Sequence, residues 1–221
     1  MKEQIRTKRL TLVPLTDGEL EALMNRETDP HMKGAYGEML SGCRDHPADR
    51  LFYTEWRMTL PDGTSIGGLG FKGPAVNGAV DLGYGVDPAY RGNGYATEAA
   101  AGMIRWAFAR QDVYVVEAEA EPNNAASLSV LRKLGFTEIG TGREGLRFEK
   151  EKPASALTTV YMSVGMCLGT AVGAALDKLS LALPIGLCLG LCLGNVLDGR
   201  ENEKRATLMA AREKQRNSAA R

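Results

Sequence analysis

Residues 91–97, Arg-Gly-Asn-Gly-Tyr-Ala-Thr, carry the clearest chemical signal in this chain of 221 residues. They follow residues 81–88, which alternate like a strand and end at a proline, and they precede residues 98–108, which have the spacing of an amphipathic helix. The unpaired N–H groups of a first helical turn attract anions, and the helix dipole adds to the effect. Gly92 and Gly94 allow positive φ and close approach to the backbone. The loop therefore predicts an anion site, although an ordinary strand-to-helix turn can share this composition.

Two common nucleotide motifs do not fit this loop. No Gly-Lys-Ser/Thr ending is present, which excludes a P-loop. A dinucleotide fingerprint would need a third glycine after the first strand of a βαβ unit, and here that glycine is missing and the loop lies mid-chain.

The loop does match the Arg/Gln-x-x-Gly-x-Gly/Ala signature of the GNAT N-acetyltransferases, here residues 91–96. Three more segments resemble that family in the same order. Residues 5–12 look like the first strand of the ribosomal-protein alanine and serine acetyltransferase branch, residues 82–88 like the central strand, and residues 121–136 like the second motif. The resemblance implies an α/β GNAT fold for residues 1–152, with a mixed, mostly antiparallel central sheet flanked by helices.

The same resemblance implies acetyl-CoA as co-substrate. In the family, the glycine-rich loop holds the pyrophosphate, the central strand hydrogen-bonds the pantetheine amides, and an Asn-x-x-Ser asparagine helps to hold the pantetheine arm. Carried over to this chain, the binding residues are Tyr84, Gly85, Val86, Arg91, Gly92, Asn93, Gly94, Tyr95, Ala96, Thr97 and Asn124. Asn124 precedes an alanine-rich helix, so it is also a typical N-cap.

Acetyl transfer needs a base for the amine and a proton for the leaving thiolate. Ser127 lies where the resembled branch places a serine near the coenzyme sulfur, and it could donate that proton. Asp81 lies where many relatives carry a glutamate base, but its side chain is one methylene shorter. Tyr84 or Glu55 could take its place. Each of these residues could instead be an ordinary sheet residue, and Glu98 is interpreted as structural because it opens a helix.

The acceptor site is less well defined. In the family, residues 28–50 would shape it, with Tyr36 among them, and residues 143–148 would form the other wall. Three acidic side chains in the first segment could attract a cationic amine or could simply be solvated: Glu38, Asp45 and Asp49.

The elements that must position these residues follow from periodicity and turn signals. Strands are predicted over residues 9–13, 51–60, 65–72, 80–86 and 113–120, and again after Phe136, with hairpin turns at 61–64 and 73–78. Helices are predicted over 17–26, with Asp17 as N-cap, and over 125–133. Residues 28–50 are rich in Gly, Pro, Asp and His, which predicts short helix mixed with loop.

Residues 153–198 differ in character from the domain before them. Two uncharged runs, 154–176 and 179–197, are each about as long as a bilayer span of roughly 20 residues. Glycine recurs every fourth residue in both, at 165, 169 and 173 and at 186, 190 and 194. Such spacing lets two helices approach closely in lipid and resembles glycine-zipper membrane regions. We expect a transmembrane helical hairpin. The alternative is a soluble hairpin covering the enzyme domain, although each exposed helical glycine would cost about 1 kcal/mol.

Residues 199–221 form a basic, polar tail with seven Lys or Arg and three Glu residues. Excess positive charge beside a span favours the cytoplasmic side. Because two spans return the chain to its starting side, the enzyme domain is expected at the cytoplasmic face of the membrane. A solvated tail on a soluble cytoplasmic protein is the alternative.

Composition limits the remaining functions. The formal net charge is zero, so no overall field attracts nucleic acid. Cys188 and Cys192 would share a helix face but lack further ligands, so packing is expected rather than a metal site. The sequence favours a membrane-tethered N-acetyltransferase that moves an acetyl group directly to a primary amine. Alternatives are a polyamine or aminoglycoside acceptor rather than a protein N-terminus, or a non-catalytic acyl-CoA-binding module that assembles through its glycine-zipper helices as a homo-oligomer.

Overall fold

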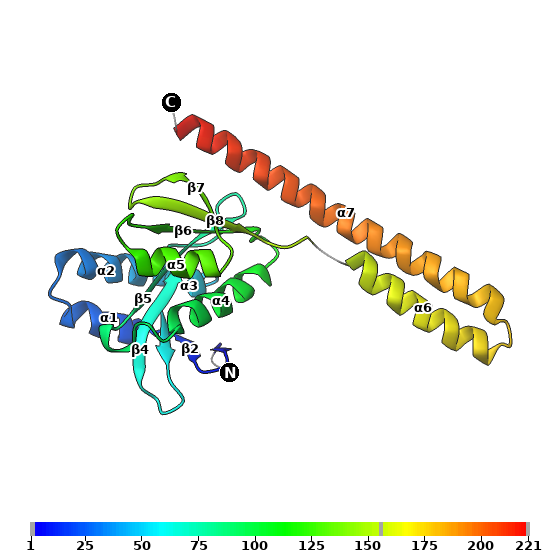
Figure 1. Ribbon diagram of the computed structural model, residues 1–221, viewed down its shortest axis with the longest axis horizontal. Helices are drawn as coiled ribbons and strands as arrows, with labels where there is room; N and C mark the ends of the chain where they lie inside the picture. Colours follow the sequence, from blue (N-terminus) through cyan, green and yellow to red (C-terminus); the bar gives the residue numbers. More distant parts are fainter. Residues whose placement is uncertain (1–2, 155–156, 220–221) are drawn as a thin grey trace. The chain divides into compact units, whose positions relative to one another are not determined.

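The computed structural model describes residues 3–154 and 157–219 (Figure 1). The chain divides into two compact units, Met1–Lys152 and Pro153–Arg221. Residues 155–156 of the predicted hairpin and the end of the tail, including Arg221, lie outside the described residues.

The first unit is built on an eight-stranded sheet with the order β1-β2-β3-β4-β5-β6-β8-β7. All neighbouring strands are antiparallel except β5 and β6, which are parallel. The strands are β1 (Ile5–Arg6), β2 (Thr11–Pro14), β3 (Trp56–Thr59), β4 (Ser65–Phe71), β5 (Ala79–Val86), β6 (Val115–Ala120), β7 (Thr137–Thr141) and β8 (Leu146–Glu151). This arrangement confirms the expected mixed, mostly antiparallel sheet.

The parallel pair β5–β6 separates part of the way along its length. Its register covers three residue pairs and ends at Asp81 opposite Glu117. Beyond that point β5 stays paired with β4 as far as Val86, while β6 stays paired with β8 as far as Ala120. The two strands therefore diverge, and residues 82–86 of β5 have no ladder partner on the β6 side among the described residues.

Two helices on one face of the sheet bury the main core. α4 (Tyr95–Phe108) packs against β1, β4, β5 and β6 and against α5 (Ala125–Lys133). Small residues on α4, such as Ala99, Ala100 and Gly102, allow it to lie close to the sheet. Met103 of α4 and the β3 residues Trp56 and Met58 are fully buried in this core. Burial of this apolar surface is the main stabilising contribution to the unit.

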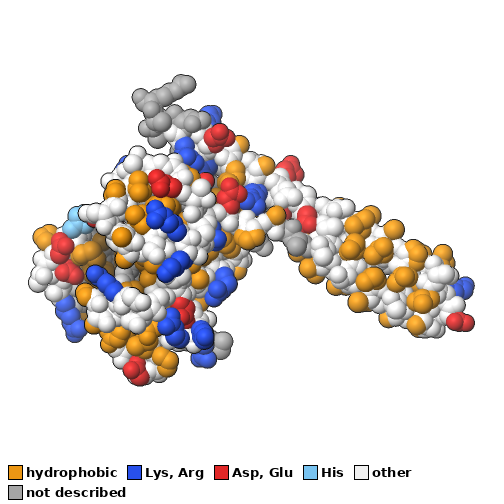
Figure 2. Space-filling model, in the orientation of Figure 1, with side chains coloured by type: hydrophobic (Ala, Val, Ile, Leu, Met, Phe, Trp, Pro, Cys, Tyr) orange, Lys and Arg blue, Asp and Glu red, His pale blue; other side chains and the backbone are white. Residues whose placement is uncertain are grey.

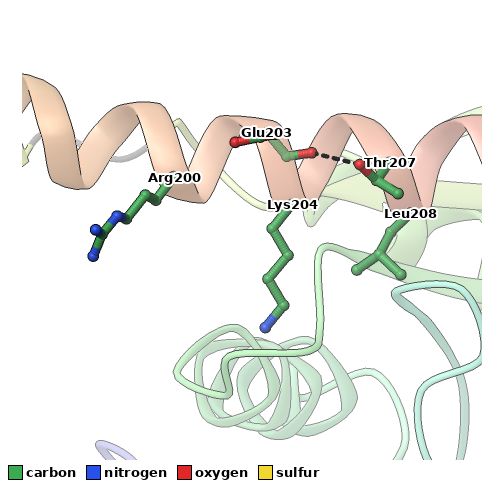
Figure 3. A pocket seen from close by; sticks show the side chains of 5 residues that line it. All are labelled: Arg200, Glu203, Lys204, Thr207 and Leu208. Atoms are coloured by element: carbon green, nitrogen blue, oxygen red, sulfur yellow. Dashed lines mark hydrogen bonds between the residues drawn. The ribbon is translucent and has the colours of Figure 1, made fainter.

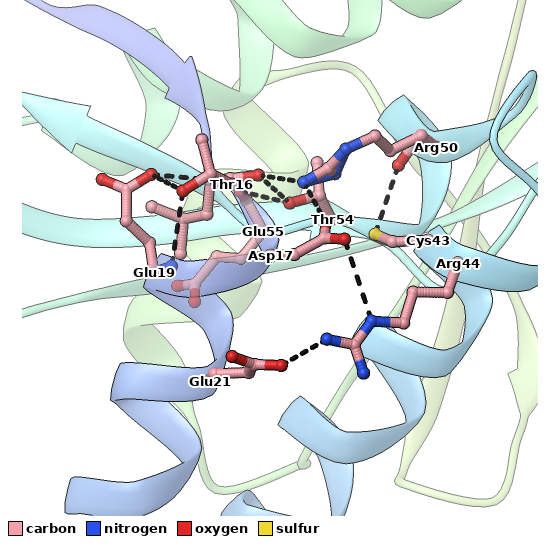
Figure 4. A network of polar contacts seen from close by, with 10 residues as sticks. Thr16, Asp17, Glu19, Glu21, Cys43, Arg44, Arg50, Thr54 and Glu55 are labelled. Carbon is pink, nitrogen blue, oxygen red and sulfur yellow. Dashed lines mark hydrogen bonds and ion pairs between the residues drawn. The ribbon is translucent and has the colours of Figure 1, made fainter.

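A second, smaller core joins α1 (Asp17–Arg26), α2 (Pro30–Asp45) and the short α3 (Arg50–Tyr53). The expected N-cap of α1, Asp17, is wrong: Thr16 is the cap, and its reciprocal hydrogen bonds with Glu19 form a capping box. Asp17 instead pairs with Arg50 at 2.7 Å, which ties α1 to α3 (Figure 4).

Two predicted elements differ from the structure. Residues 28–50 hold one helix of 16 residues rather than short helix and loop, because Asp29 caps it and Pro30 occupies the first turn. Gly42 is needed there, since a Cβ atom would collide with the Tyr53 ring. Residues 51–60 are not one strand. Their first part forms α3, and the indole N–H of Trp56 donates to the Leu51 carbonyl, which fixes the bend between helix and strand.

The second unit is a helical hairpin of α6 (Leu157–Ala175) and α7 (Leu179–Ala219). Glycines line the contact between the helices, as the spacing predicts. A Cβ atom at Gly169 would lie 2.6 Å from the Ala182 carbonyl oxygen, and one at Gly165 would collide with the carbonyl of Gly186. At the open end, Asp198 of α7 accepts a hydrogen bond of 2.8 Å from the N–H of Thr158 and so caps α6.

Both hairpin helices are long and apolar enough to cross a membrane. Their outward side chains are exposed leucine, valine, isoleucine and methionine, and Figure 2 shows hydrophobic side chains gathered over the hairpin. No break separates this apolar part from the basic tail, because α7 continues as one helix through Asp198.

Candidate active site

The glycine-rich loop joins β5 to the start of α4. Gly92 and Gly94 have φ of +79° and +78°, the left-handed region that the sequence predicts and that other residues rarely adopt. Gly94 is the N-cap of α4, so the first N–H groups of the helix point out of its open end. Residues 91–94 are exposed, and a Cβ at Gly92 would meet no atom within 4 Å. The loop thus offers hydrogen-bond donors and open space for an anion.

Arg9 is a second basic residue at this loop, and sequence reasoning missed it. Its guanidinium Nη1 donates to the Asn93 carbonyl at 3.1 Å, and its guanidinium lies 4.6 Å from the Tyr95 ring centre. Arg9 also pairs with Glu98 at 2.7 Å. Its position more than 80 residues from the loop in sequence explains the omission, because only the pairing of the N-terminal segment with α4 brings them together.

Glu98 has the structural role that its place at a helix start predicts. It accepts hydrogen bonds from the Thr7 hydroxyl at 2.7 Å and from the Arg9 backbone N–H at 2.6 Å. Burial raises the pKa of Glu98, but the hydrogen bonds from Thr7 and Arg9 outweigh burial and hold it below its ordinary value. The carboxylate thereby fastens the N-terminal segment to the base of the anion loop.

The diverging part of β5 carries Tyr84, Gly85 and Val86, the residues predicted to hold the pantetheine arm. Their edge toward β6 is open, as a ligand that adds like a strand requires. On the facing helix, Asn124 caps α5 by accepting from the Ser127 N–H at 3.0 Å. The predicted capping role is therefore confirmed. Because the cap uses the Oδ1 atom of Asn124, it is compatible with a ligand contact at the amide nitrogen.

Tyr84 and Ser127 meet beside this edge. The two hydroxyl oxygens are 2.9 Å apart, within hydrogen-bond distance, and the Tyr84 hydroxyl also lies 3.4 Å from the Ser127 carbonyl. Burial raises the pKa of Tyr84, and the hydrogen bond to Ser127 offsets only part of that rise. Two of the predicted catalytic residues are thus brought together, with both hydroxyls in the protonated form at neutral pH.

Asp81 lies apart from that pair. It is three residues from Tyr84 on the same strand, so the two side chains point to opposite faces of the sheet. Its carboxylate pairs with Lys72 at 3.3 Å, while its Oδ1 atom is buried without a hydrogen-bond partner among the described residues. Burial raises the pKa of Asp81 more than Lys72 lowers it.

The residues expected around the acceptor divide into two groups. Glu38, Asp45 and Asp49 are exposed on α2 and the turn after it, which fits the solvated interpretation. Tyr36 is partly buried, and its pKa is raised by burial and by the nearby charge of Glu55. In residues 143–148, the other predicted wall, Glu144 pairs with Lys72 at 2.9 Å.

Two other features lie outside this constellation. A surface pocket is lined by side chains of α7 alone, namely Arg200, Glu203, Lys204, Thr207 and Leu208 (Figure 3). In the part of the chain that the structure describes, no cluster of three or more His, Cys, Asp or Glu side chains could hold a metal ion.

Comparison with known proteins identifies the class to which this fold and loop belong. Residues 9–137 match the acetyltransferase (GNAT) domain family, which is more than half of the chain, and the chain therefore belongs to this family of acyltransferases. Residues 152–200 match a second family, described as glycine zipper membrane protein.

Individual relatives agree with this assignment. The chain is 37% identical over 86 residues to the uncharacterized N-acetyltransferase YjdG of Bacillus subtilis, covering 38% of this chain and 51% of that protein. The chain thus spans about half the length of the curated relatives it matches. Among solved structures, RimL, a ribosomal alpha-N-protein acetyltransferase in complex with coenzyme A, is 18% identical with a TM-score of 0.55, covering 69% of this chain and 100% of RimL. A spermidine N-acetyltransferase chimera from Vibrio cholerae and hSSAT is 16% identical with a TM-score of 0.52, covering 65% and 96%.

Proposed function

We propose that this protein is an acetyl-CoA-dependent N-acetyltransferase that transfers an acetyl group directly to a primary amine. The divergence of β5 from β6 beside the loop of Gly92 and Gly94 is the observation that carries the proposal. It combines an open strand edge with an anion site at a helix N-terminus. RimL, a protein with the same fold, has been solved in complex with coenzyme A, which supports acetyl-CoA as the donor.

In this proposal the chain contributes mainly by positioning its substrates. The loop residues Arg91 to Thr97, with Arg9 beside them, hold the pyrophosphate. The edge of Tyr84, Gly85 and Val86, together with Asn124, aligns the pantetheine arm. Alignment of two reactants can supply several kcal/mol of the barrier reduction without any covalent role for the enzyme.

Acetyl transfer joins the amine nitrogen to the acetyl carbon and breaks the carbon–sulfur bond. One proton must leave the amine, and one must reach the sulfur. Ser127 is suited to deliver the second proton, because its hydroxyl is hydrogen-bonded to Tyr84, which can replenish the proton in turn. Asp81, through water, is suited to accept the first, since its raised pKa makes it a better base near neutral pH.

Thiol release from acetyl-CoA with a panel of amines tests the proposal. The panel contains a peptide N-terminus, a polyamine and an aminoglycoside, and calorimetry with coenzyme A runs in parallel. Release that depends on an amine supports the transferase. Tight coenzyme binding with no release from any amine would instead favour a non-catalytic acyl-CoA-binding module.

We further propose that the hairpin of residues 153–198 tethers the enzyme domain to the cytoplasmic face of a membrane. This proposal is supported by the length of α6, which is close to the thickness of the hydrocarbon core of a bilayer. The 19 residues of α6 extend about 28 Å at 1.5 Å per residue, close to the roughly 30 Å of a hydrocarbon core. The basic residues of the tail beyond Asp198 agree with a cytoplasmic end.

A further inference from the structure

One face of the central strands is made of glycine. In the β4–β5 ladder, Gly68 lies opposite Gly85 and Gly70 lies opposite Gly83. Residues two apart share a face, so these four residues, here called the glycine face, lie on the side opposite to the buried Leu82 and Phe71. No atom lies within 4 Å of a Cβ built at Gly83 or Gly85, so the surface above β5 is open.

Two carboxylates border the glycine face. Glu55 lies against Gly68, where any Cβ would collide with its carboxylate. At the other end, Asp81 continues the same face, since Lys72 N–H donates to the Asp81 carbonyl two residues beyond the Gly70–Gly83 pair. Each carboxylate has one buried oxygen without a hydrogen-bond partner among the described residues, Glu55 Oε2 and Asp81 Oδ1. A buried carboxylate oxygen without a partner is costly, and a bound cationic ligand would remove that cost.

The two carboxylates differ in whether a basic side chain pairs with them. Asp81 has Lys72 as an ion-pair partner, and Lys72 also pairs with Glu144. Glu55 is in none of the ion pairs formed by the described residues, and Arg57 pairs with Glu19 at 3.0 Å. Burial raises the pKa of Glu55, and the charge of Arg57 offsets only part of that rise. In Figure 4 the Glu55 carboxylate accordingly has no dashed contact, although the residues around it are densely connected. Glu55 is therefore the position on this face with the strongest demand for an external cation.

The glycine face also adjoins the proposed reaction centre. Its residue Gly85 is next to Tyr84, whose hydroxyl meets Ser127 on the other side of the sheet. Because residues 82–86 have no ladder partner on the β6 side among the described residues, a group at this edge can be approached from either face. An amine attacking a thioester must be neutral, so a cation held at Glu55 has to be a second nitrogen of the same acceptor.

We propose, resting on the transferase function above, that the glycine face is the acceptor site and that it takes an unbranched aliphatic polyamine whose second ammonium group pairs with Glu55. The open part of this face, above Gly83 and Gly85, has no side chains and admits a thin methylene chain lying along β5, beside the Glu55 carboxylate that covers Gly68. An acceptor with one amine and no second charge would leave Glu55 without a partner.

Putrescine and n-butylamine form a matched pair of probes, because they share a four-carbon chain and differ in the second amine. The full-length protein in detergent should acetylate putrescine with a kcat/KM roughly 10- to 100-fold above that for butylamine, the range expected for a hydrogen-bonded charge. In Glu55→Gln this preference should collapse, with unchanged coenzyme A affinity. Glu138→Gln, an exposed residue of β7, should keep the preference and serves as the control. Three outcomes would overturn the proposal. The parent protein could have equal kcat/KM for the two amines, it could have a higher kcat/KM for a peptide N-terminus without a second charge, or its preference for putrescine could survive Glu55→Gln.

A second variant and a binding measurement separate this proposal from the transferase function. Gly83→Val adds bulk to the open face without a steric conflict and suits a strand, so the domain should fold and bind coenzyme A while KM for putrescine rises. If no amine releases thiol, the transferase function fails, and calorimetry of spermidine with the coenzyme-A-loaded protein still tests the site. Spermidine binding that is lost in Glu55→Gln supports the acceptor site, and absence of binding to the parent protein overturns it.

Discussion

Ser127 is the residue on which the proposed chemistry depends most directly. Its hydroxyl lies 2.9 Å from that of Tyr84, and its own N–H is held by Asn124 at 3.0 Å, so helix capping fixes the rotation of the first turn that presents it. The same short segment thus supplies both a structural cap and a candidate proton donor. Sequence reasoning identified both roles of this segment but could not show that Tyr84 would reach it.

Ser127→Ala should lower kcat roughly 10²-fold or more while changing the acetyl-CoA KM little, because a general acid acts mainly in the transition state. Steady-state thiol release with a saturating amine provides the measurement. Ser129→Ala, two residues along the same helix, is the matched control and should retain parental turnover. If Ser127→Ala stays within about twofold of the parent, the thiolate takes its proton from another source.

Glu98→Gln should destabilise the domain at neutral pH by about 1 kcal/mol, because it weakens charged hydrogen bonds to Thr7 and Arg9 at a partly exposed site. The folded pKa of Glu98 is depressed, so its stabilising contribution is present above the unfolded pKa and is lost as the pH falls through the folded value. Urea unfolding of parent and variant at pH 7 and near pH 4 measures this difference. It should shrink on acidification, and a gap that is constant with pH would assign the effect to packing.

At the scale of elements, the loop before α4 combines two requirements in one glycine. Gly94 must have positive φ to begin the helix and must leave its end open to an anion. These requirements predict different outcomes for different substitutions, because strain affects folding and charge affects binding.

Gly94→Glu should abolish coenzyme A binding in calorimetry, since it places negative charge and bulk at the proposed pyrophosphate site. The left-handed conformation also costs roughly 1–2 kcal/mol for any residue with a Cβ. Gly94→Ala shares that strain without the charge, so it should lose similar stability and keep measurable binding. Unchanged affinity in Gly94→Glu would remove this loop from the donor site.

The glycines at the contact between α6 and α7 predict how bulkier residues would change the hairpin. Gly169→Leu with Gly190→Leu should keep the hairpin in the membrane but separate its helices, because bulk replaces backbone contact. Spin labels on the exposed Cys167 and Cys188, in a Cys192→Ser background, would report the separation as a longer distance between labels. Ala171→Leu, an exposed position on α6, is the control. An unchanged distance in the double variant would show that the glycines are not needed for close packing.

Sequence patterns predicted the parts of the fold that depend on local spacing and composition. The helix at residues 125–133, the positive φ of Gly92 and Gly94, and the glycine contacts of the hairpin all follow from such local rules. The patterns failed where tertiary packing decides. α2 is continuous despite its glycines because it packs along α1 and α3, and Gly42 is the residue that leaves room there for the Tyr53 ring. Arg9 and the glycine face remained hidden because both depend on contacts between distant segments.

For the whole molecule, the two units should have separable properties. Residues 1–152 alone should be soluble and should bind coenzyme A, because all proposed donor residues lie within them. The full chain should fractionate with membranes and resist alkaline carbonate extraction, as a spanning segment does. The measurement compares membrane and soluble fractions of the two proteins. A soluble full-length chain, together with an aggregating 1–152 fragment, would indicate that the hairpin covers the enzyme domain instead.

The continuity of α7 has a mechanical consequence. One ladder of backbone hydrogen bonds runs from the apolar residues through Asp198 into the basic tail, so the tail keeps a fixed angular phase relative to the glycine row. Each residue advances that phase by about 100°, and the residues beyond Asp198 extend the axis by roughly 30 Å. Any axial rotation of the apolar segment must therefore turn the charged side chains of the tail by the same angle, because one continuous helix rotates as a rigid unit.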